Sequence, residues 1–390
     1  MISEIKRISM CLFTIILMIL SFSCDSGNGG DNWPTPVISG VSTDYDGFAV
    51  SGKPVTLSGS GFSPVAADNK VLHGVGLGAV SLEVTEASAD HLVFIAPETS
   101  EQKLKIRVSV KGKESETFEL KFDNSLMDVD ISEIFAKGTT VTVREGVEWT
   151  TFHGVWEGNM RNINIIKTTL NNHNRIGIYH QYDGERMNLD EKCEYLDALV
   201  GTNGPMRCCH FVRVNGVVKR VANDQDPWIT NCAMTIDNGV PDIVRVKDNY
   251  EASDLPNQNV GTAGPLLIYE GRIQEYPHWA NEDFLKTTHP RTGFGISKDQ
   301  KTVYQVAVDG RFMGAPEKTA VGLPIPLLAK LMKGLGCYKA LNFDGGGGTA
   351  MWIYGHGKNG IVNHPCDELN WDDPVLRATG NAIYIVSDLK

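Results

Sequence analysis

The most unusual stretch of the sequence is Asp344-Gly345-Gly346-Gly347-Gly348-Thr349, in which four glycines follow one another. Consecutive glycines lose much conformational entropy on ordering and add no side chain to packing, so this stretch must need bare backbone. Peptide N–H groups in such a loop can approach an anion closely and form a nest for phosphate or carboxylate. It is not a P-loop, because the Lys-Ser/Thr ending and a following helix are both missing. The structural alternative is a tight hairpin or bulge, which one or two glycines would satisfy.

Two aspartates, Asp309 and Asp344, each follow an apolar run typical of a strand, so we expect their side chains at a sheet edge. Cleavage of a glycosidic bond needs a carboxylic acid to protonate the leaving oxygen and a carboxylate to act as base or nucleophile. These aspartates are therefore the candidate catalytic pair. His289 is a candidate proton carrier, and the alternative for it is a hydrogen-bonding group of the core.

Three arginines are candidates for binding a phosphate. A phosphate leaves as a good anion, so acid assistance matters less, and a guanidinium can hold it through two parallel hydrogen bonds. Arg291 and Arg311 follow turn-forming residues, and Arg377 precedes the last strand. Each alone would be interpreted as a surface salt bridge. Beside a glycine nest, at least two of the three are predicted to bind an anion.

Metal and cysteine chemistry receive less support. Paired aspartates are suitable ligands for Ca²⁺ or Mg²⁺, but no EF-hand-like run of acidic residues is present, so no cofactor is predicted as required. The six cysteines after Cys24 allow fifteen disulfide pairings, and no CxxC pair with a second ligand pair predicts zinc. For each of the six, a buried free thiol or a structural disulfide is favoured over a nucleophile.

The elements that must position these residues belong to a C-terminal domain over residues 126–390. Alternating or buried strands are expected at residues 139–143, 303–308, 340–343, 350–354 and 382–386. Leu327, Leu328, Leu331, Met332 and Leu335 recur at helical spacing and predict an amphipathic helix that ends at Gly334 and Gly336. We predict an α+β fold in which helices pack on a mixed sheet.

The segment from residue 34 to 125 is different in character. Short alternating apolar runs separated by turn residues extend from Val37 to Leu120 and predict a small all-β sandwich. Pro36-Val37-Ile38, Gly52 before Val55-Thr56-Leu57, and Gly59-Ser60-Gly61-Phe62 resemble the IPT/TIG family of immunoglobulin-like domains. Such modules act as spacers or binding platforms, and no catalytic constellation occurs in this segment. Asp44 and Asp46 are interpreted as loop residues rather than metal ligands.

The first residues are predicted to be an export signal. Lys6 and Arg7 precede a nearly continuous apolar run from Met10 to Leu20, which is too short for a comfortable transmembrane helix. Residues 1–23 then form a signal peptide, and Ser21-Phe22-Ser23-Cys24 resembles a lipobox at which Cys24 is acylated. Plain signal cleavage near Ser23 is the alternative. Residues 24–33 are polar and predict a flexible tether, so we expect a lipid-anchored protein of the bacterial cell envelope.

The net charge of −11 argues against nucleic acid as a partner, because phosphate binding along a nucleic acid needs a broad excess of Lys and Arg. The sequence predicts no oligomeric state. It also leaves open which membrane face bears the protein.

The glycine run with its flanks, from Ala340 to Met351, resembles the signature of the phosphodiester glycosidase family. That family includes the vertebrate mannose 6-phosphate uncovering enzyme, which removes N-acetylglucosamine from a sugar phosphodiester. The resemblance implies a glycoside hydrolase for an N-acetylhexosamine 1-phosphodiester or a related glycan linkage. Its supporting motifs follow in order along the chain: Ala263–Leu267, His289–Gly295, Val308–Arg311 and Val362–Pro365, then Arg377 and Asn381.

The same resemblance implies a set of site residues. Asp309, Asp344 and His289 would be catalytic. The residues expected to bind the substrate or its phosphate are Asn203, Arg291, Thr292, Arg311, Asn342, Gly345, Gly346, Gly347, Gly348, Thr349, Asn363 and Arg377.

One departure from the family pattern concerns the substrate. Where the family has Asn-Gly-Gly followed by aromatic residues, this chain has Asn203-Gly204-Pro205-Met206, so a rigid proline replaces a glycine and an aromatic platform is lost. This loop and the sandwich domain favour a rival interpretation, a glycan-binding lipoprotein without catalysis. Asp309, Arg311, Asp344 and the glycine run favour the enzyme. Nuclease-like cleavage of a phosphodiester is disfavoured by the acidic charge.

Overall fold

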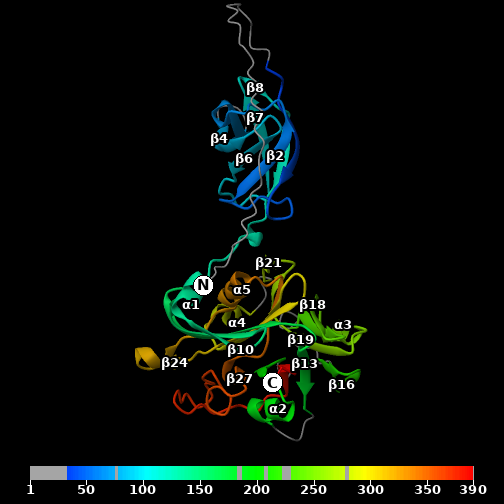
Figure 1. Ribbon diagram of the computed structural model, residues 1–390, viewed down its shortest axis with the longest axis vertical. Coiled ribbons are helices and arrows are strands. Elements are labelled where there is room, and N and C mark those ends of the chain that lie inside the picture. Colours follow the sequence, from blue (N-terminus) through cyan, green and yellow to red (C-terminus); the bar gives the residue numbers. More distant parts are fainter. Residues whose placement is uncertain are drawn as a thin grey trace, which may run out of the picture. The chain divides into compact units, whose positions relative to one another are not determined.

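The computed structural model describes residues 33–74, 78–181, 187–205, 210–221, 230–276 and 281–389. They form two compact units that divide between Phe122 and Asp123 (Figure 1). The predicted signal peptide, the lipidation candidate Cys24 and the tether apart from Trp33 lie outside the described residues. No described helix is long and apolar enough to cross a membrane.

The N-terminal unit is an immunoglobulin-like sandwich, as predicted. One sheet has the order β1-β2-β6-β5, and the other has the order β4-β3-β7-β8 with β9 also paired to β7. Alternate residues of β2, β6 and β7 are completely buried and form the core: Val55, Leu57, Leu92, Phe94, Ile106 and Val108. The strands are β1 (Val37–Ser42), β2 (Pro54–Ser60), β3 (Asn69–His73), β4 (Val80–Leu82), β5 (Val84–Ala87), β6 (His91–Ile95), β7 (Lys103–Val110), β8 (Lys113–Glu114) and β9 (Phe118–Lys121).

The C-terminal unit is built on an eight-stranded sheet with the order β10-β11-β12-β23-β22-β26-β20-β21. Its longest ladder joins β11 and β12, from Val147↔Thr168 to Trp156↔Asn159. The strands are β10 (Thr139–Arg144), β11 (Val147–Trp156), β12 (Asn159–Thr169), β20 (Leu266–Tyr269), β21 (Arg272–Ile273), β22 (Arg291–Ile296), β23 (Thr302–Val308) and β26 (Lys339–Asn342).

Two smaller sheets and a short hairpin complete the unit. The four-stranded sheet has the order β13-β28-β14-β27, with β13 (Asn174–His180), β14 (Val200–Asn203), β27 (Met351–Ile353) and β28 (Asn381–Ser387). The five-stranded sheet has the order β16-β15-β19-β17-β18, with β15 (Val212–Val214), β16 (Val217–Arg220), β17 (Cys232–Asp237), β18 (Val240–Arg245) and β19 (Asn259–Ala263). The hairpin pairs β24 (Phe312–Met313) with β25 (Thr319–Ala320).

Both faces of the eight-stranded sheet are apolar, as β23 illustrates. Val303 and Ala307 lie in a core shared with the four- and five-stranded sheets, whereas Val306 and Val308 pack with helix α5. The predicted helix is thus confirmed as α5, and β22 has glycines that let it pack closely: a Cβ on Gly295 would lie 2.8 Å from Met332 Cε. The helices are α1 (Ser132–Lys137), α2 (Leu189–Tyr195), α3 (Asn249–Ser253), α4 (Glu282–Lys286) and α5 (Ile325–Gly334), with short 3₁₀ turns η1 (Ala66–Asp68), η3 (Asn124–Leu126), η4 (Pro316–Lys318) and η5 (Gly346–Gly348).

The C-terminal fold is α+β, as predicted, with one refinement. A mixed sheet was expected, but every ladder between the described strands of this unit is antiparallel. Short connections explain the difference, because β10-β11-β12 and β22-β23 follow one another through tight turns that can join only antiparallel neighbours.

Several strands bring their polar ends to one place. The start of β22 is paired with the end of β23 through Arg291↔Val308, and Gly293 of β22 is paired with Asn342 at the end of β26. In the four-stranded sheet, the end of β14 lies beside the start of β28 through Asn203↔Ala382. Asp309 and Asp344, which follow β23 and β26, therefore emerge in the same region.

The described cysteines are buried free thiols. Cys193, Cys232, Cys337 and Cys366 form no disulfide, and burial raises the pKa of each thiol. Cys208 and Cys209 lie outside the described residues. Of the two favoured alternatives, the free thiol therefore holds for the four described cysteines.

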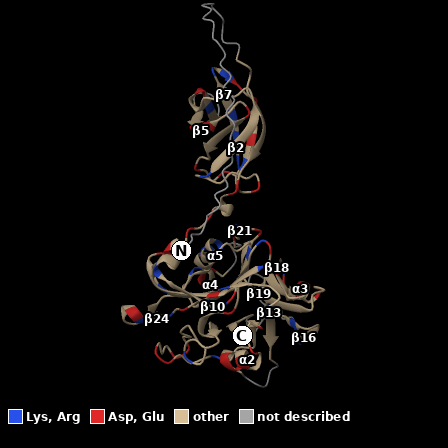
Figure 2. Cartoon of the chain, viewed as in Figure 1, with Lys and Arg blue, Asp and Glu red and all other residues tan. Residues whose placement is uncertain are grey.

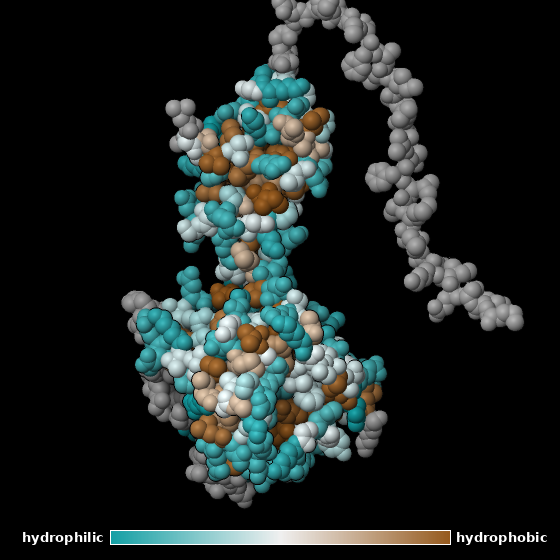
Figure 3. Space-filling view, turned by 90° about the vertical axis from the view of Figure 1, so that its left-hand side faces the viewer, coloured by the Kyte–Doolittle hydropathy of each residue, from teal (hydrophilic) through white to brown (hydrophobic). Residues whose placement is uncertain are grey.

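Acidic and basic residues are interspersed over each unit in the view of Figure 2, and the part drawn there in colour has no broad basic face. The face shown in Figure 3 is mainly hydrophilic, with small separate apolar patches. This distribution agrees with the acidic composition, a net charge of −11.

Candidate active site

Asp344 follows β26 and lies half-buried at the edge of the glycine turn. The amide of Gly345 donates to its Oδ1 at 2.9 Å, and this is the one hydrogen bond that the described residues give to the carboxyl group. Burial raises the pKa of Asp344 to about 6, while the Gly345 amide and the charge of Arg377 oppose the rise. A carboxyl group that titrates near neutral pH and is not occupied by donors is suited to proton exchange or to nucleophilic attack.

Asn203 fixes the backbone of Asp344. Its Nδ2 donates to the Asp344 carbonyl at 2.7 Å, and its Oδ1 accepts from the Thr292 hydroxyl at 2.8 Å and from the Ala350 amide at 3.1 Å. Asn203 and Thr292 are completely buried. Both were predicted to bind substrate, but their polar atoms are used inside the protein, so their role here is to position Asp344.

Asp309 is buried beneath the site and enclosed by donors. Its Oδ1 accepts from Asn363 Nδ2 at 2.7 Å, and its Oδ2 accepts from Asn162 Nδ2 at 2.6 Å and from the His364 amide at 2.9 Å. Burial raises the pKa of Asp309, while His364 and these donors oppose the rise. The catalytic role predicted for Asp309 does not fit this environment, because the carboxylate is inaccessible and its oxygens are already bonded. It acts as an internal anchor.

Asn363 belongs to the same anchor. Besides Asp309, its Nδ2 reaches the Thr349 carbonyl at 3.1 Å, and its Oδ1 accepts from the Met351 amide at 2.7 Å. Only 2% of the residue is exposed, so the predicted substrate contact is replaced by a brace between the glycine turn and β27.

Arg291 is also structural. Its Nε donates to the Leu323 carbonyl at 3.0 Å, and its Nη2 donates to the carbonyls of Phe284 and Thr287 at 2.7 and 3.1 Å. Burial lowers the pKa of Arg291 to about 10. The predicted phosphate contact is not made from this position, because the guanidinium is buried and its described hydrogen bonds run to backbone carbonyls at α4 and at Leu323, just before α5.

Arg311 and His289 face the turn together. Arg311 has a left-handed backbone, with φ of +68°, and its Nη2 lies 3.3 Å from His289 Nδ1. A guanidinium has no acceptor, so Arg311 donates and a neutral His289 carries its proton on Nε2. Burial, followed by the charges of Arg291 and Arg311, lowers the pKa of His289 and favours this neutral form.

The glycine turn itself uses most of its amides internally. Gly345 donates to Asp344 Oδ1, Gly346 to the Pro290 carbonyl at 3.0 Å, Gly348 to the Gly345 carbonyl at 3.2 Å, and Thr349 to the Gly346 carbonyl at 3.1 Å. Among the described hydrogen bonds, the Gly347 amide alone of these five has no acceptor. The amides available to the predicted anion nest are therefore few, because the turn closes on itself and on Pro290, the residue before β22.

The glycines are needed because other groups press against the bare backbone. A Cβ on Gly345 would lie 2.6 Å from the Pro290 carbonyl oxygen, and one on Gly348 would lie 3.2 Å from Asp344 Oδ2. A Cβ on Gly347 would overlap the carboxylate of Asp367. Gly346 has a φ of +60°, which disfavours any side chain. The run thus serves close approach by charged side chains and by β22.

We expect Gly345→Ala to lower the free energy of unfolding by about 1–3 kcal/mol, because the new methyl group must displace the carbonyl group of Pro290, just before β22. Thermal unfolding measures the effect. Gly314→Ala is the matched control, since its Cβ would lie 3.6 Å from the nearest atom, the Lys318 carbonyl oxygen, and φ is not positive. Equal melting temperatures for the two variants would contradict this explanation of the turn.

Two family models match the chain, one in each compact unit. The family model for phosphodiester glycosidase matches residues 197–386, and the model for the IPT/TIG domain matches residues 36–122. The C-terminal unit therefore contains a region similar to the phosphodiester glycosidase family. The comparison with curated proteins found no match.

Two solved structures resemble the chain at low identity. The catalytic domain of zebrafish N-acetylglucosamine-1-phosphodiester alpha-N-acetylglucosaminidase, auto-inhibited by its pro-peptide, is 18% identical; the match covers 66% of this chain and 91% of that one, with a TM-score of 0.48. A hypothetical protein from Synechocystis is 12% identical; that match covers 90% of this chain and 81% of the other, with a TM-score of 0.47.

Within the C-terminal unit, the predicted side chains fall into three groups. Asp344, His289, Arg311 and Arg377 surround the turn with functional groups that are not deeply buried. Asn342 and Thr349 are buried beside it, and their Oδ1 and Oγ1 atoms have no hydrogen-bond partner among the described residues. The other predicted side chains support the site from behind: Asn203, Arg291, Thr292, Asp309 and Asn363.

Two residues of this region, Asn162 and Asp367, were missed, and Asn381 was noted only as part of a supporting motif. Asn162 and Asn164 alternate with Ile163 and Ile165 in β12, and amides placed among apolar strand residues were a signal that could have been used. Asn381 accepts from the Gly204 amide at 3.1 Å and donates to the Pro205 carbonyl at 2.8 Å, which fixes the loop that departs from the family pattern. Asp367 lies in a segment without regular structure, where no periodicity marks it.

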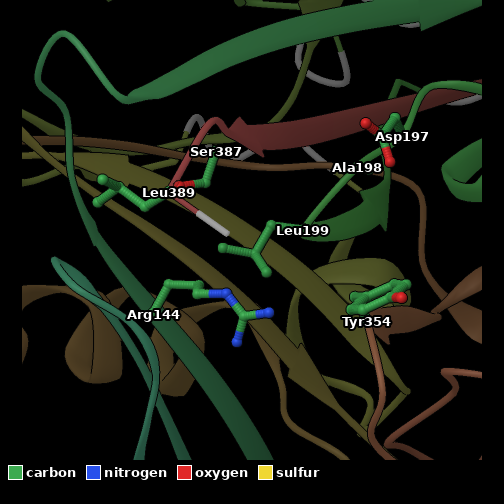
Figure 4. A pocket seen from close by; sticks show the side chains of 7 residues that line it. All are labelled: Arg144, Asp197, Ala198, Leu199, Tyr354, Ser387 and Leu389. Atoms are coloured by element: carbon green, nitrogen blue, oxygen red, sulfur yellow. The ribbon is translucent and has the colours of Figure 1, made fainter.

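Several cavities lined by described residues lie in the C-terminal unit away from the glycine turn. Two of them, of about 340 and 260 Å³, share Asp197, Ala198 and Tyr354 (Figure 4). The larger of the two, drawn in Figure 4, lies near the end of β28 at Ser387, at the opposite end of the four-stranded sheet from Asn203. Among the described residues, no three His, Cys, Asp or Glu side chains are grouped to hold a metal ion.

Proposed function

We propose that the C-terminal unit hydrolyses the bond between a sugar, of the N-acetylhexosamine type, and a phosphodiester or a related glycan linkage of the bacterial envelope. The observation that carries the proposal is Asp344, whose carboxyl group has a pKa raised to about 6 and feels the charge of Arg377. The glycine turn that follows it is bordered by a second guanidinium group, that of Arg311, at Gly346. In the reaction, oxygen from water becomes bonded to the anomeric carbon, the carbon–oxygen bond to phosphate breaks, and a phosphomonoester leaves.

The residues divide this work by their chemistry. Ionised Asp344 acts as the base on water or as the nucleophile, since a phosphate leaving group needs little protonation. The guanidinium groups stabilise the charge that develops on the phosphate oxygens. Neutral His289, with its proton on Nε2, supplies a further donor next to Arg311.

A substrate panel tests the proposal. Purified protein is incubated with sugar 1-phosphodiesters and with aryl glycosides, and released sugar is detected by mass spectrometry. We expect release from the phosphodiesters, unchanged by a chelator, because no cofactor is proposed. If no member of the panel is hydrolysed although it binds, the rival function is favoured.

The rival function is glycan binding without catalysis. The observation in its favour is Asp309, which was expected to be the second catalytic carboxylate and is instead enclosed by Asn162, Asn363 and His364. A phosphate leaving group departs as a stable anion, so the reaction does not need a second carboxyl group as general acid. For this reason we favour the enzyme.

We also propose that Cys24 carries a lipid anchor in the envelope, because an apolar run ends just before it and a polar tether follows. Cys24→Ala is expected to move the protein from the membrane fraction to the soluble envelope fraction, as measured by immunoblotting. Retention of the variant in membranes would contradict the anchor.

A further inference from the structure

Two guanidinium groups lie against neighbouring glycines of the turn. Arg311 Nη2 is 3.3 Å from the position of a Cβ on Gly346, and Arg377 Nη2 is 2.7 Å from the position of a Cβ on Gly347. Both cations therefore border the same short piece of backbone, including the Gly347 amide. That amide is the one of the turn without an acceptor among the described hydrogen bonds.

The two arginines differ in their partners. The described contacts of Arg311 are His289 Nδ1 at 3.3 Å and Cys366 Sγ at 3.9 Å, neither of them a carboxylate. Arg377 is paired with Asp367 through both prongs of its guanidinium: Nε donates to Oδ2 at 2.7 Å, and Nη2 donates to Oδ1. Arg311 thus has no carboxylate counter-ion among the described residues, whereas Arg377 has an internal counter-ion, Asp367.

Asp367 presents two oxygens to Arg377 in the geometry that a phosphodiester would use. Carboxylate and phosphate both accept two parallel hydrogen bonds from a guanidinium, and a phosphodiester carries one negative charge, as a carboxylate does. The Asp367 carboxylate also lies so close to Gly347 that a Cβ there would overlap it. It occupies the place above the turn where an anion would be held.

We propose that Asp367 is an internal substitute for the substrate's phosphate, and that a phosphodiester displaces it from Arg377 and is then held between Arg377 and Arg311 above Gly346 and Gly347. This inference rests on the proposed function for its substrate class, and it adds the residue that selects for an anionic linkage. A neutral glycoside offers Arg377 no replacement charge, so it leaves Asp367 in place.

The exchange is energetically accessible. The side chains of Arg377 and Asp367 are 47% and 26% exposed, and an ion pair with this exposure contributes little net stability. Displacement conserves the charge around Arg377, whereas Arg311 gains an anionic partner. Asp367 lies between His364 and Asn381 in a segment without helix or strand, so moving it breaks no sheet pairing.

The test measures binding of inorganic phosphate and of N-acetylglucosamine 1-phosphate to the full chain by calorimetry, without turnover of a diester. Asp367→Asn removes the competing charge and is expected to tighten binding of both anions about 3- to 10-fold. Asp372→Asn is the matched control, because Asp372 belongs to the same segment and forms its own ion pair with Lys318 at 2.6 Å. It makes the same change in net charge and should alter binding less than twofold.

Asp367→Glu keeps the competing charge and should bind both anions no more tightly than the unaltered protein. If Asp367→Asn binds them equally or more weakly, the inference is overturned and Asp367 merely positions Arg377. Should the Asn variant unfold, Asp367→Ser is measured in its place with the same expected tightening. Tightened binding in a protein that hydrolyses no glycoside would support this inference and refute the proposed hydrolysis, so the two failures are distinguishable.

Discussion

Asp344→Asn is expected to lower kcat on a sugar 1-phosphodiester by a factor on the order of 10² to 10⁴, because the amide keeps the shape of the carboxyl group but can neither accept a proton nor attack carbon. Ground-state binding should change much less. The Gly345 amide can still donate to Asn Oδ1, so the turn keeps the contact now made at 2.9 Å. Steady-state kinetics with mass detection of released sugar measure the change.

The pH profile gives the same assignment a second test. In the proposed reaction the ionised form of Asp344 is active, so kcat/KM should fall as the pH is lowered through about 6, where the buried carboxyl group takes up a proton. A residue acting as the general acid would give the opposite profile, with activity lost above about pH 6. Asp344→Asn should remove this titration from the residual activity.

Stability separates loss of catalysis from loss of fold. The folded-state pKa of Asp344 is raised from 3.8 to about 6, so ionisation of this carboxyl group destabilises the folded protein. The destabilisation is absent below about pH 4, where the group is protonated in both states, and reaches its full size above about pH 6. Asp344→Asn should therefore raise the free energy of unfolding at pH 7, by about 1–3 kcal/mol, and the gain should vanish near pH 4. A stable variant with near-normal turnover would refute the catalytic assignment and favour the glycan-binding rival.

Much of the fold could be predicted because it depends on local alternation. In β23, Val303, Val306, Ala307 and Val308 alternate between two apolar faces, and this pattern is visible in the sequence. The direction of strand pairing is less visible, since it depends on which connections are tight turns. That is why a mixed sheet was expected where the ladders are antiparallel.

The sequence predicted the chemical groups of the site better than the hydrogen bonds between them. The glycine run, Asp344 and Arg311 stand out locally, whereas the roles of Asp309 and Asn203 depend on hydrogen bonds to residues 147 and 141 positions away in the chain. Arg291 shows the limit clearly. Its charge suggested an anion site, but tertiary packing buries it among carbonyls, which no spacing of residues indicates.

The glycine turn shows the same limit in another way. Four glycines imply that bare backbone is needed, but not whether a ligand or the protein itself uses it. Here the carbonyl of Pro290 and the Asp367 carboxylate fill the space next to Gly345 and Gly347. The need for glycine was readable from the sequence, and the identity of the neighbouring groups was not.

Asp309→Asn should have its largest effect on stability, with a loss of about 2–4 kcal/mol and a lower melting temperature. The three partners of this carboxylate are all N–H donors, from Asn162, Asn363 and His364. An asparagine must turn its own NH₂ group toward at least one of them, which leaves buried donors facing each other without an acceptor. Burial of the residue, which is 1% exposed, gives water no access to relieve this mismatch.

Thermal and denaturant unfolding measure the loss, and Asp373→Asn is the matched control. Asp373 makes an ion pair with Lys358 at the surface, where its side chain is 66% exposed, so the same chemical change there should shift stability by less than about 0.5 kcal/mol. The sequence alone assigned Asp309 to catalysis, and that assignment makes the opposite prediction. A variant that keeps normal stability but loses turnover 100-fold or more would restore Asp309 as a catalytic carboxylate and show that its three donors release it during the reaction.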